Sequence, residues 1–284
     1  MKRSIFRAYR FALALALALA LALGWSVPAA AAALTIPGAG PPEAGLRALA
    51  AEFSRQAGAG TIDIPKSIGI AGGLRVINAG EADLVRLARR LSDEELRAGG
   101  FSQLVYATDA VVFAAGRDVP VDNLTEGHVL ALFSGKLDDW EALGGKPAPV
   151  LVFYREPSEI AHQGIKRQLP AFGTLSFAPM AKLANSDTDM LDGLTRYRHA
   201  LGWLPMSAVQ ASSGQVKALA FNGVRATPEQ MAAGRYRFNI EHVLVYRERK
   251  LGDEARRFLG FVASDEGARV LRSLSLLPSR PPPK

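Results

Sequence analysis

The chain has 284 residues, no cysteine, and a formal net charge of +7 from 34 Lys and Arg against 27 Asp and Glu. Without cysteine we expect no disulfide, no thiolate metal site and no lipid anchor on an N-terminal cysteine. About 250 residues follow the N-terminal segment, enough for one large or two small domains with an ample core.

Residues 1–33 have the pattern of a cleaved secretory signal. Four basic side chains fall within the first ten residues, an Ala/Leu run follows at 11–23, and small residues at 28–33 suit a signal peptidase. The alternative is a permanent membrane anchor, but the apolar run is shorter than the roughly 20 residues that a bilayer requires. We therefore expect export and removal of residues 1–33. The remaining chain would carry a net charge of +3, without the basic block typical of nucleic-acid binding.

Strand-like and helix-like segments alternate along the rest of the chain. Apolar and β-branched runs predict strands at 34–36, 61–64, 82–87, 105–115, 150–154, 200–205, 216–221 and 239–246, and a strand with a turn at 182–189. Helical spacing and N-cap residues predict helices at 43–56, 74–79, 161–169, 190–199, 253–263 and 265–273, one that begins at Ser92, and one from Thr125 to near Phe133. This alternation predicts right-handed βαβ units on a mostly parallel sheet.

The segment 106–155 is the most informative part of the chain. It contains Ala-Thr-Asp, an apolar strand, Asn-Leu-Thr, a helix, Phe-Ser-Gly, a tryptophan, Gly-Gly, a second strand and Arg-Glu, in that order. This order resembles the middle of the phosphate-like periplasmic substrate-binding proteins, and the resemblance extends from about residue 37 to residue 278.

The resemblance implies a two-lobed α/β periplasmic binding protein of type 2, with mixed, mostly parallel sheets and a hinge of two crossing strands. Lobe I would comprise 34–113 and 244–278, lobe II would comprise 114–243, and the Pro-rich tail 279–284 would be disordered. It also implies a periplasmic monomer that passes a small anion, phosphate or a related oxyanion, to an ABC transporter permease in the inner membrane. No cofactor, enzymatic activity or nucleic-acid partner is expected.

An oxyanion held without a metal requires convergent N–H and hydroxyl donors, which helix N-termini supply. The loop 67–73 resembles the Ser-x-Gly-Ser-x-Gly segment of the family, which assigns Ser67, Ile68 and Gly69 to the ligand. In the segment 80–89 the resemblance makes Asp83 the acceptor for a protonated phosphate and adds Arg89. The alternative there is an i, i+3 pair of Asp83 with Arg86 on a solvated helical face.

Arg155 matches the arginine whose planar guanidinium pairs with the anion in this family. Beyond Pro157 the match fails, because Ser158 and Glu159 replace the Gly and Ser of the family pattern. Glu159 would repel an anion, unless the loop slides so that Ser158 faces the ligand and Glu159 faces solvent.

The loop 38–43, between the first predicted strand and the first predicted helix, also has fewer donors and more negative charge than the family pattern. Pro41 and Pro42 lack the donors that the family supplies after its Gly-x-Gly, and Glu43 adds a negative charge. A second hypothesis therefore stays open: a scaffold of the same fold with no phosphate binding and a role in signalling or assembly. The four histidines have no metal-ligand spacing, and we expect His162 to be a solvated helix residue.

Overall fold

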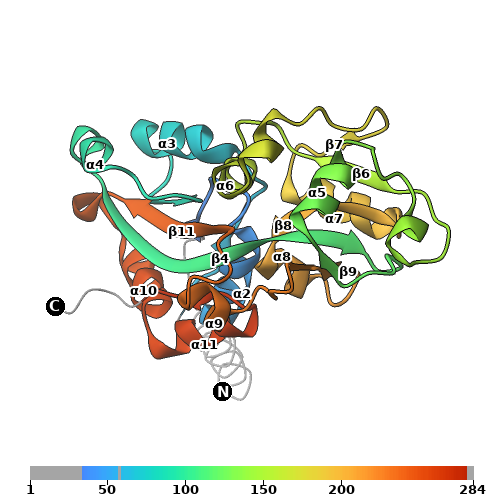
Figure 1. The fold of residues 1–284 in the computed structure, drawn as a ribbon. Helices are drawn as coiled ribbons and strands as arrows, with labels where there is room; N and C mark the ends of the chain where they lie inside the picture. Colours follow the sequence, from blue (N-terminus) through green and yellow to red (C-terminus); the bar gives the residue numbers. More distant parts are fainter. Residues whose placement is uncertain (1–33, 57–58, 280–284) are drawn as a thin grey trace, which may run out of the picture.

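The computed structural model describes residues 34–56 and 59–279. The predicted signal at 1–33 and residues 280–284 of the predicted tail lie outside the described residues. Two α/β lobes lie side by side and are joined by two long strands, β4 (Ser102–Gly116) and β11 (Asn239–Tyr246), as Figure 1 shows. Among the described residues, every helix is too short or too polar to cross a lipid bilayer.

The first lobe contains both ends of the described chain. Its elements are β1 (Leu34–Thr35), α2 (Glu43–Phe53), β2 (Ile62–Asp63), α3 (Gly69–Ala79), β3 (Leu84–Leu87), α4 (Asp93–Gly99), α10 (Asp253–Val262), α11 (Asp265–Ser273) and β12 (Leu277–Pro278).

The second lobe is built from the middle of the chain. Its elements are β5 (Asn123–Leu124), α5 (Glu126–Phe133), β6 (Leu151–Tyr154), α6 (Ile160–Gln168), β7 (Lys182–Leu183), α7 (Asp187–Arg196), β8 (Ala200–Pro205), α8 (Met206–Ala211), β9 (Val216–Ala218), β10 (Ala220–Phe221) and α9 (Pro228–Ala232).

The main sheet runs through both lobes in the order β3-β11-β4-β8-β6-β7, and β9 and β12 also pair with β4. Strand β4 runs antiparallel to β11 and β8, whereas β6 runs parallel to β8 and β7. The mixed α/β architecture is therefore confirmed. Antiparallel pairing is more extensive than the strand–helix alternation predicts, because the two crossing strands run in opposite directions.

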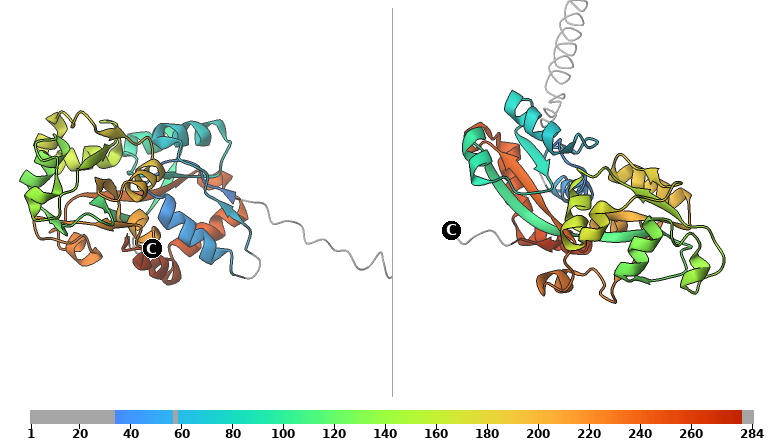
Figure 2. Two further views of the ribbon diagram at one scale, coloured as in Figure 1. Left: turned by 90° about the vertical axis from the view of Figure 1, so that its right-hand side faces the viewer. Right: turned by 45° about the horizontal axis from the view of Figure 1, so that its top comes forward.

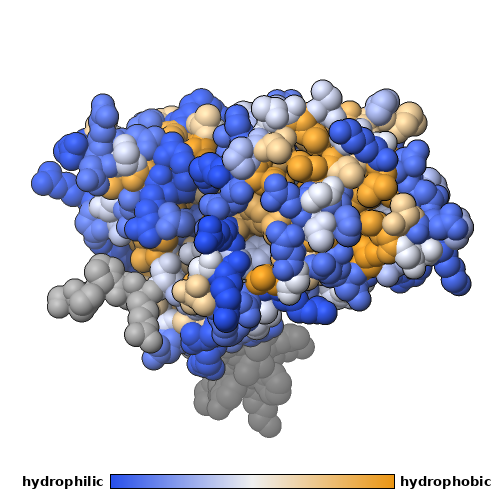
Figure 3. Space-filling view, in the orientation of Figure 1, coloured by the Kyte–Doolittle hydropathy of each residue, from blue (hydrophilic) through white to orange (hydrophobic). Residues whose placement is uncertain are grey.

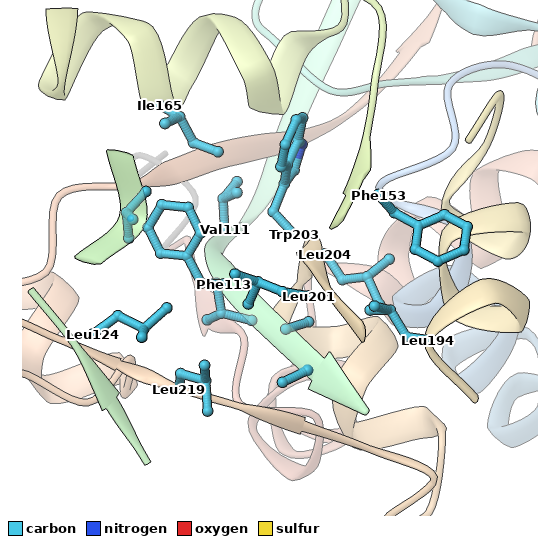
Figure 4. Close-up of a cluster of buried hydrophobic side chains, with 14 of the residues drawn as sticks. Val111, Phe113, Leu124, Phe153, Ile165, Leu194, Leu201, Trp203, Leu204 and Leu219 are labelled. Atoms are coloured by element: carbon cyan, nitrogen blue, oxygen red, sulfur yellow. The ribbon is translucent and has the colours of Figure 1, made fainter. Parts of the chain in front are cut away.

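The buried side chains form a separate core in each lobe, and β4 contributes to both. Tyr106 and Ala107 pack with α2, α10 and α11, whereas Ala110 and the residues after it pack with the aromatic core of the second lobe. Figure 4 shows this second core around Phe113 and Trp203. On β11 the change falls between Ile240 and Val243. We propose the lobe boundaries at these changes, against the sequence-based boundaries at 113/114 and 243/244.

Local signals explain most helix boundaries. Ser92 and Thr125 each accept a hydrogen bond from the backbone three residues on and form a capping box, so the predicted starts of α4 and α5 are confirmed. Gly80 ends α3 in the left-handed region with φ 74°. Helix α7 begins at Asp187, earlier than the predicted 190, because Ser186 accepts a hydrogen bond from Asp189 N. This earlier start brings the first turn of α7 to the boundary between the lobes.

The lobes meet where α2 contacts α8, and the side view in Figure 2 shows these two helices side by side. The surface in Figure 3 is largely hydrophilic, with apolar side chains more frequent over the second lobe. Ser279 still belongs to the folded part, since its N–H donates to the carbonyl of Tyr106 at 2.9 Å.

Candidate ligand cavity between the lobes

A cavity of about 690 Å³ lies between α2 of the first lobe and α7 and α8 of the second. Its volume falls within the roughly 300–1,000 Å³ that is typical of small-molecule sites. The first lobe contributes the start of α2, the segment of Lys66 and Ser67, and Leu274, whereas the second contributes residues 185–189, Leu191, Ala208 and Ala211. The cavity therefore combines the N-termini of two helices with an apolar wall.

The turn before α2 is fixed by a close approach of two backbones. Gly38 has φ 140°, and a Cβ atom there would lie 2.0 Å from the carbonyl oxygen of Arg86, so only glycine fits. Pro42 at the N-cap supplies no side-chain acceptor. Glu43 in the first turn of α2 pairs with Arg47 at 2.8 Å and lies 3.5 Å from Arg86. The charge of Glu43 is therefore largely balanced within its own lobe.

Arg86 is fully buried beneath this turn. Its guanidinium donates to the carbonyl oxygens of Ile36, Ala39 and Pro65, at 2.7 Å for the latter two. Burial lowers the pKa of Arg86, and Glu43 opposes that shift. The alternative of a solvated helical pair with Asp83 is wrong, because Arg86 lies on the buried strand β3 and ties the two loops of the first lobe together.

Ser67 lies at the edge of the cavity beside Lys66. Its hydroxyl oxygen accepts from Gly69 N at 3.3 Å. Ile68 and Gly69 are both exposed and belong to the start of α3, which begins five residues before the predicted 74. Of these three predicted ligand residues, Ser67 alone lines the cavity.

Arg155 and Asp187 meet at the boundary between the lobes. Arg155 Nη1 donates to Asp187 Oδ1 at 2.5 Å, and Nη2 lies 3.4 Å from the carbonyl oxygen of Asn185. Asp187 Oδ2 is buried without a hydrogen-bond partner. A methyl group on Gly40 would lie 3.3 Å from this oxygen and 3.5 Å from Ser67 Oγ. A carboxylate of the second lobe therefore rests against the two loops of the first.

Burial raises the pKa of Asp187 to about 6. The guanidinium of Arg155 opposes this shift, and the negative charges of Glu159 and Glu43 add to it. The carboxyl group therefore changes its protonation state close to neutral pH.

Glu159 is the N-cap of α6. Its two carboxylate oxygens accept from Ala161 N and His162 N, both at 2.9 Å. The backbone donors that a bound anion would use at this helix are therefore occupied by a side chain of the protein. Ser158 is exposed and does not line the cavity.

His162 is only 3% exposed, so the expectation of a solvated residue is wrong. Its ring packs against Phe172 and Trp203, and Nδ1 lies 3.2 Å from the carbonyl oxygen of Arg155. The helical spacing of α6 indicates that one face of the helix is buried, but it does not show that His162 belongs to that face.

Asp83 and Arg89 lie away from the cavity. Asp83 is exposed just before β3, where a Cβ atom on Gly252 would lie 3.4 Å from Asp83 Oδ2. Arg89 donates to both carboxylate oxygens of Glu95 at 2.9 and 2.7 Å, and this contact lowers the pKa of Glu95 to about 2. In contrast, Ser67 and the first turn of α7 line the cavity together. Arg155 pairs with Asp187 of that turn but does not line the cavity itself. The sequence predicts this turn of α7 as a turn after a strand.

Comparison with known proteins identifies the class. Residues 26–266 match the family model of the PBP superfamily domain, and the chain belongs to that family. A phosphate-binding protein PstS of Borreliella burgdorferi is 21% identical over 196 residues, which cover 67% of this chain and 70% of the relative.

Solved structures support the same fold. A putative phosphate ABC transporter substrate-binding protein from Clostridium perfringens, with bound phosphate, superposes with a TM-score of 0.72 at 22% identity, over 88% of this chain and all of the other. The periplasmic molybdate-binding protein of Azotobacter vinelandii gives 0.60 at 15% identity, over 86% of this chain and 98% of the other. The predicted two-lobed periplasmic-binding-protein fold is thereby confirmed.

Proposed function

We propose that the chain is a periplasmic solute-binding protein that captures a small anion between its lobes for an ABC-type importer. The observation that carries this proposal is the cavity that places Ser67 and the start of α2 opposite the start of α7. Arg155 does not line the cavity itself but pairs with Asp187, which does. These groups come from separate parts of the chain and from both lobes. Closure of two lobes on a shared ligand is the usual hinge mechanism of this class.

The chemistry of the cavity supports an anion. Two helix N-termini direct positive dipole ends toward the cavity, Ser67 offers a hydroxyl, and Lys66 makes no ion pair among the described residues. Arg155 supplies a planar fork suited to oxyanions. Phosphate and related oxyanions are the first candidates, since relatives are named for phosphate and molybdate. The apolar wall also leaves room for an organic substituent.

A second candidate function rests on the two carboxylates of the second lobe. Asp187 pairs with Arg155, and Glu159 occupies the first turn of α6. Both contacts reduce the positive potential that an anion would meet. They favour a scaffold of this fold that binds no phosphate and acts in signalling or assembly.

A thermal-shift screen of the exported protein decides between the two functions. The panel contains phosphate, sulfate, molybdate, phosphonates, carboxylates and amino acids. A ligand at 100 times its Kd adds about 2.7 kcal/mol of stability, so a bound anion raises Tm measurably. We expect a saturable rise for at least one oxyanion, and a loss of that rise in Arg155→Gln. No rise across the panel would favour the scaffold.

Export is the remaining part of the proposal. We expect removal of the signal at about residue 33 and recovery of the protein from the periplasmic fraction. Mass spectrometry of that fraction measures the N-terminus directly, and an intact N-terminus retained in membranes would contradict this part.

A further inference from the structure

The carboxylate of Asp187 lies between Arg155 of the second lobe and the loops of Gly40 and Ser67 in the first. On one side Oδ1 binds Arg155 Nη1 at 2.5 Å, and on the other Oδ2 faces the α-carbon of Gly40 next to the hydroxyl of Ser67. Oδ2 accepts no hydrogen bond, although it is buried. The protein thus presents one of its own anions to the same groups that we assign to the ligand.

We propose that Asp187 is a specificity-determining residue that competes with the ligand for Arg155, so that an anion binds with uptake of one proton by Asp187. This inference rests on the proposed function of the same cavity. The Arg155–Asp187 ion pair breaks, Arg155 pairs with the incoming anion, and the carboxylate of Asp187 becomes a neutral carboxyl group. The proton comes from solvent or from the acidic form of the ligand.

The charges around Asp187 explain why it, rather than a neighbour, must change its state. Arg155 faces it from the segment after β6, Glu159 from α6 and Glu43 from α2. Asp189, on the same helix, lines the same cavity. Asp109 on β4 is buried, and burial raises its own pKa to about 7. Glu159 is held by two backbone N–H groups and Glu43 by two arginines, so both are fixed in place within their own lobes. Lys66 and Arg47 line the same cavity as cations.

An ionised Asp187 beside an anion would add to the carboxylates of Glu43, Glu159 and Asp189 around this partly dry space. Like charges repel more strongly where water is scarce. Protonation removes that charge and creates an O–H donor. Because burial already raises the pKa of Asp187 to about 6, the proton is available near neutral pH. Above about pH 6, the need for Asp187 to take up a proton lowers the affinity for the anion by up to tenfold per pH unit.

Isothermal titration with inorganic phosphate tests this inference on the full exported protein. Wild type and Asp187→Asn are titrated at pH 5.0, 6.0 and 7.5, each in two buffers of different ionisation enthalpy. Since the ionisation of phosphate is the same for both proteins, their difference isolates Asp187. Asp192→Asn, an exposed change of the same charge on α7, is the matched control.

We expect Asp187→Asn to bind phosphate at least tenfold more tightly than wild type at pH 7.5, and the two affinities to converge at pH 5.0. At pH 7.5 wild type should take up about one proton more per phosphate than Asp187→Asn, and Asp192→Asn should match wild type. If wild type already binds as tightly as Asp187→Asn at pH 7.5, or if the substitution weakens binding, the competition is overturned while the proposed function stands. If neither protein binds phosphate or any other oxyanion at any pH, the proposed function fails with it.

Discussion

His242 Nε2 lies 3.6 Å from Asp109 Oδ2 at the place where the two crossing strands pass between the lobes. Both side chains are fully buried. Ser207, at the start of α8, donates to Asp109 through its N–H and its hydroxyl, whereas both ring nitrogens of His242 lack a hydrogen-bond partner. The carboxyl group therefore links β4 to α8, whose Ala208 and Ala211 form part of the cavity wall.

Burial moves these two pKa values in opposite directions. It raises the pKa of Asp109 from 3.8 to about 7 and lowers that of His242 from 6.5 to about 3. Between about pH 4 and 6.5 the folded pair holds one proton, on Asp109, and the unfolded pair also holds one, on His242. The folded and unfolded states then bind the same number of protons. In this pH range the pair therefore does not make the free energy of unfolding depend on pH.

Substituting either residue alone should reveal the pH dependence of the free energy of unfolding that the two residues cancel in wild type. In Asp109→Asn the unfolded His242 binds a proton that the folded one does not, so stability should fall as pH decreases from 6.5 toward 3. In His242→Gln the folded Asp109 keeps a proton that the unfolded one loses, so stability should fall as pH increases from about 4 to 7. Each slope reaches at most about 1.4 kcal/mol per pH unit. Urea unfolding from pH 4 to 8 measures both, and two profiles parallel to that of wild type would contradict the assignment.

Arg86 and Arg89 should differ in their contribution to stability. Arg86→Met deprives three buried carbonyl groups of a donor and should cost on the order of 3–5 kcal/mol. Arg89→Met removes a pair with Glu95 in which both side chains are 38% exposed, and such pairs are worth about 1 kcal/mol or less. Chemical denaturation of both variants measures the free energy of unfolding. Equal losses would show that the buried contacts of Arg86 stabilise the fold no more than the exposed pair of Arg89.

Glu159 should matter as a cap rather than as a recognition group for cations. Glu159→Ser retains a side-chain acceptor for the first turn of α6, so stability should stay within about 0.5 kcal/mol of wild type, whereas Glu159→Ala should lose about 1 kcal/mol. Both remove a carboxylate near Asp187 and should strengthen anion binding. Thermal unfolding and titration together test this, and a loss of anion binding in Glu159→Ser would assign the carboxylate to the ligand instead.

Anion binding should depend on the planar shape of the Arg155 guanidinium as well as on its charge. Arg155→Lys keeps the charge but loses the planar fork, so we expect anion affinity to fall by about tenfold or more. Arg198→Lys, which alters an exposed pair with Asp118 on the second lobe, is the matched control and should leave affinity unchanged. Equal affinities for all three proteins in calorimetric titration would remove Arg155 from the site.

The sequence predicts the fold better than the site. Strands such as β8 and β11 were found at their observed bounds, because a buried strand needs an apolar run and such runs are visible without any partner. Helix starts at Ser92 and Thr125 were equally visible, since a cap is a local contact. The sequence analysis misses helices α8 and α9. Helix α9 carries the same kind of signal, with Thr227 at the N-cap and Pro228 after it, whereas α8 has no side-chain cap.

The arrangement of charges depends on contacts between distant segments. Nothing near Arg155 in sequence indicates that it pairs with Asp187, 32 residues away, and the Ser-Asp-Thr-Asp cap of α7 resembles a turn as much as a helix start. Arg86 lies within an apolar run, and nothing in that run indicates the loop carbonyls that accept from its guanidinium and make its burial favourable. Tertiary contacts decided each of these cases.

The position of a bound oxyanion tests the central claim most directly. Arsenate has the shape of phosphate and scatters anomalously, so crystals of the exported protein grown with arsenate at pH 5 would locate the anion without ambiguity. We predict a single anomalous peak between the lobes, within hydrogen-bond distance of the Arg155 guanidinium and the Ser67 hydroxyl, with Asp187 turned away from Arg155 or acting as a donor. A peak outside this cavity, or an intact Arg155–Asp187 pair with no arsenate near it, would contradict the account.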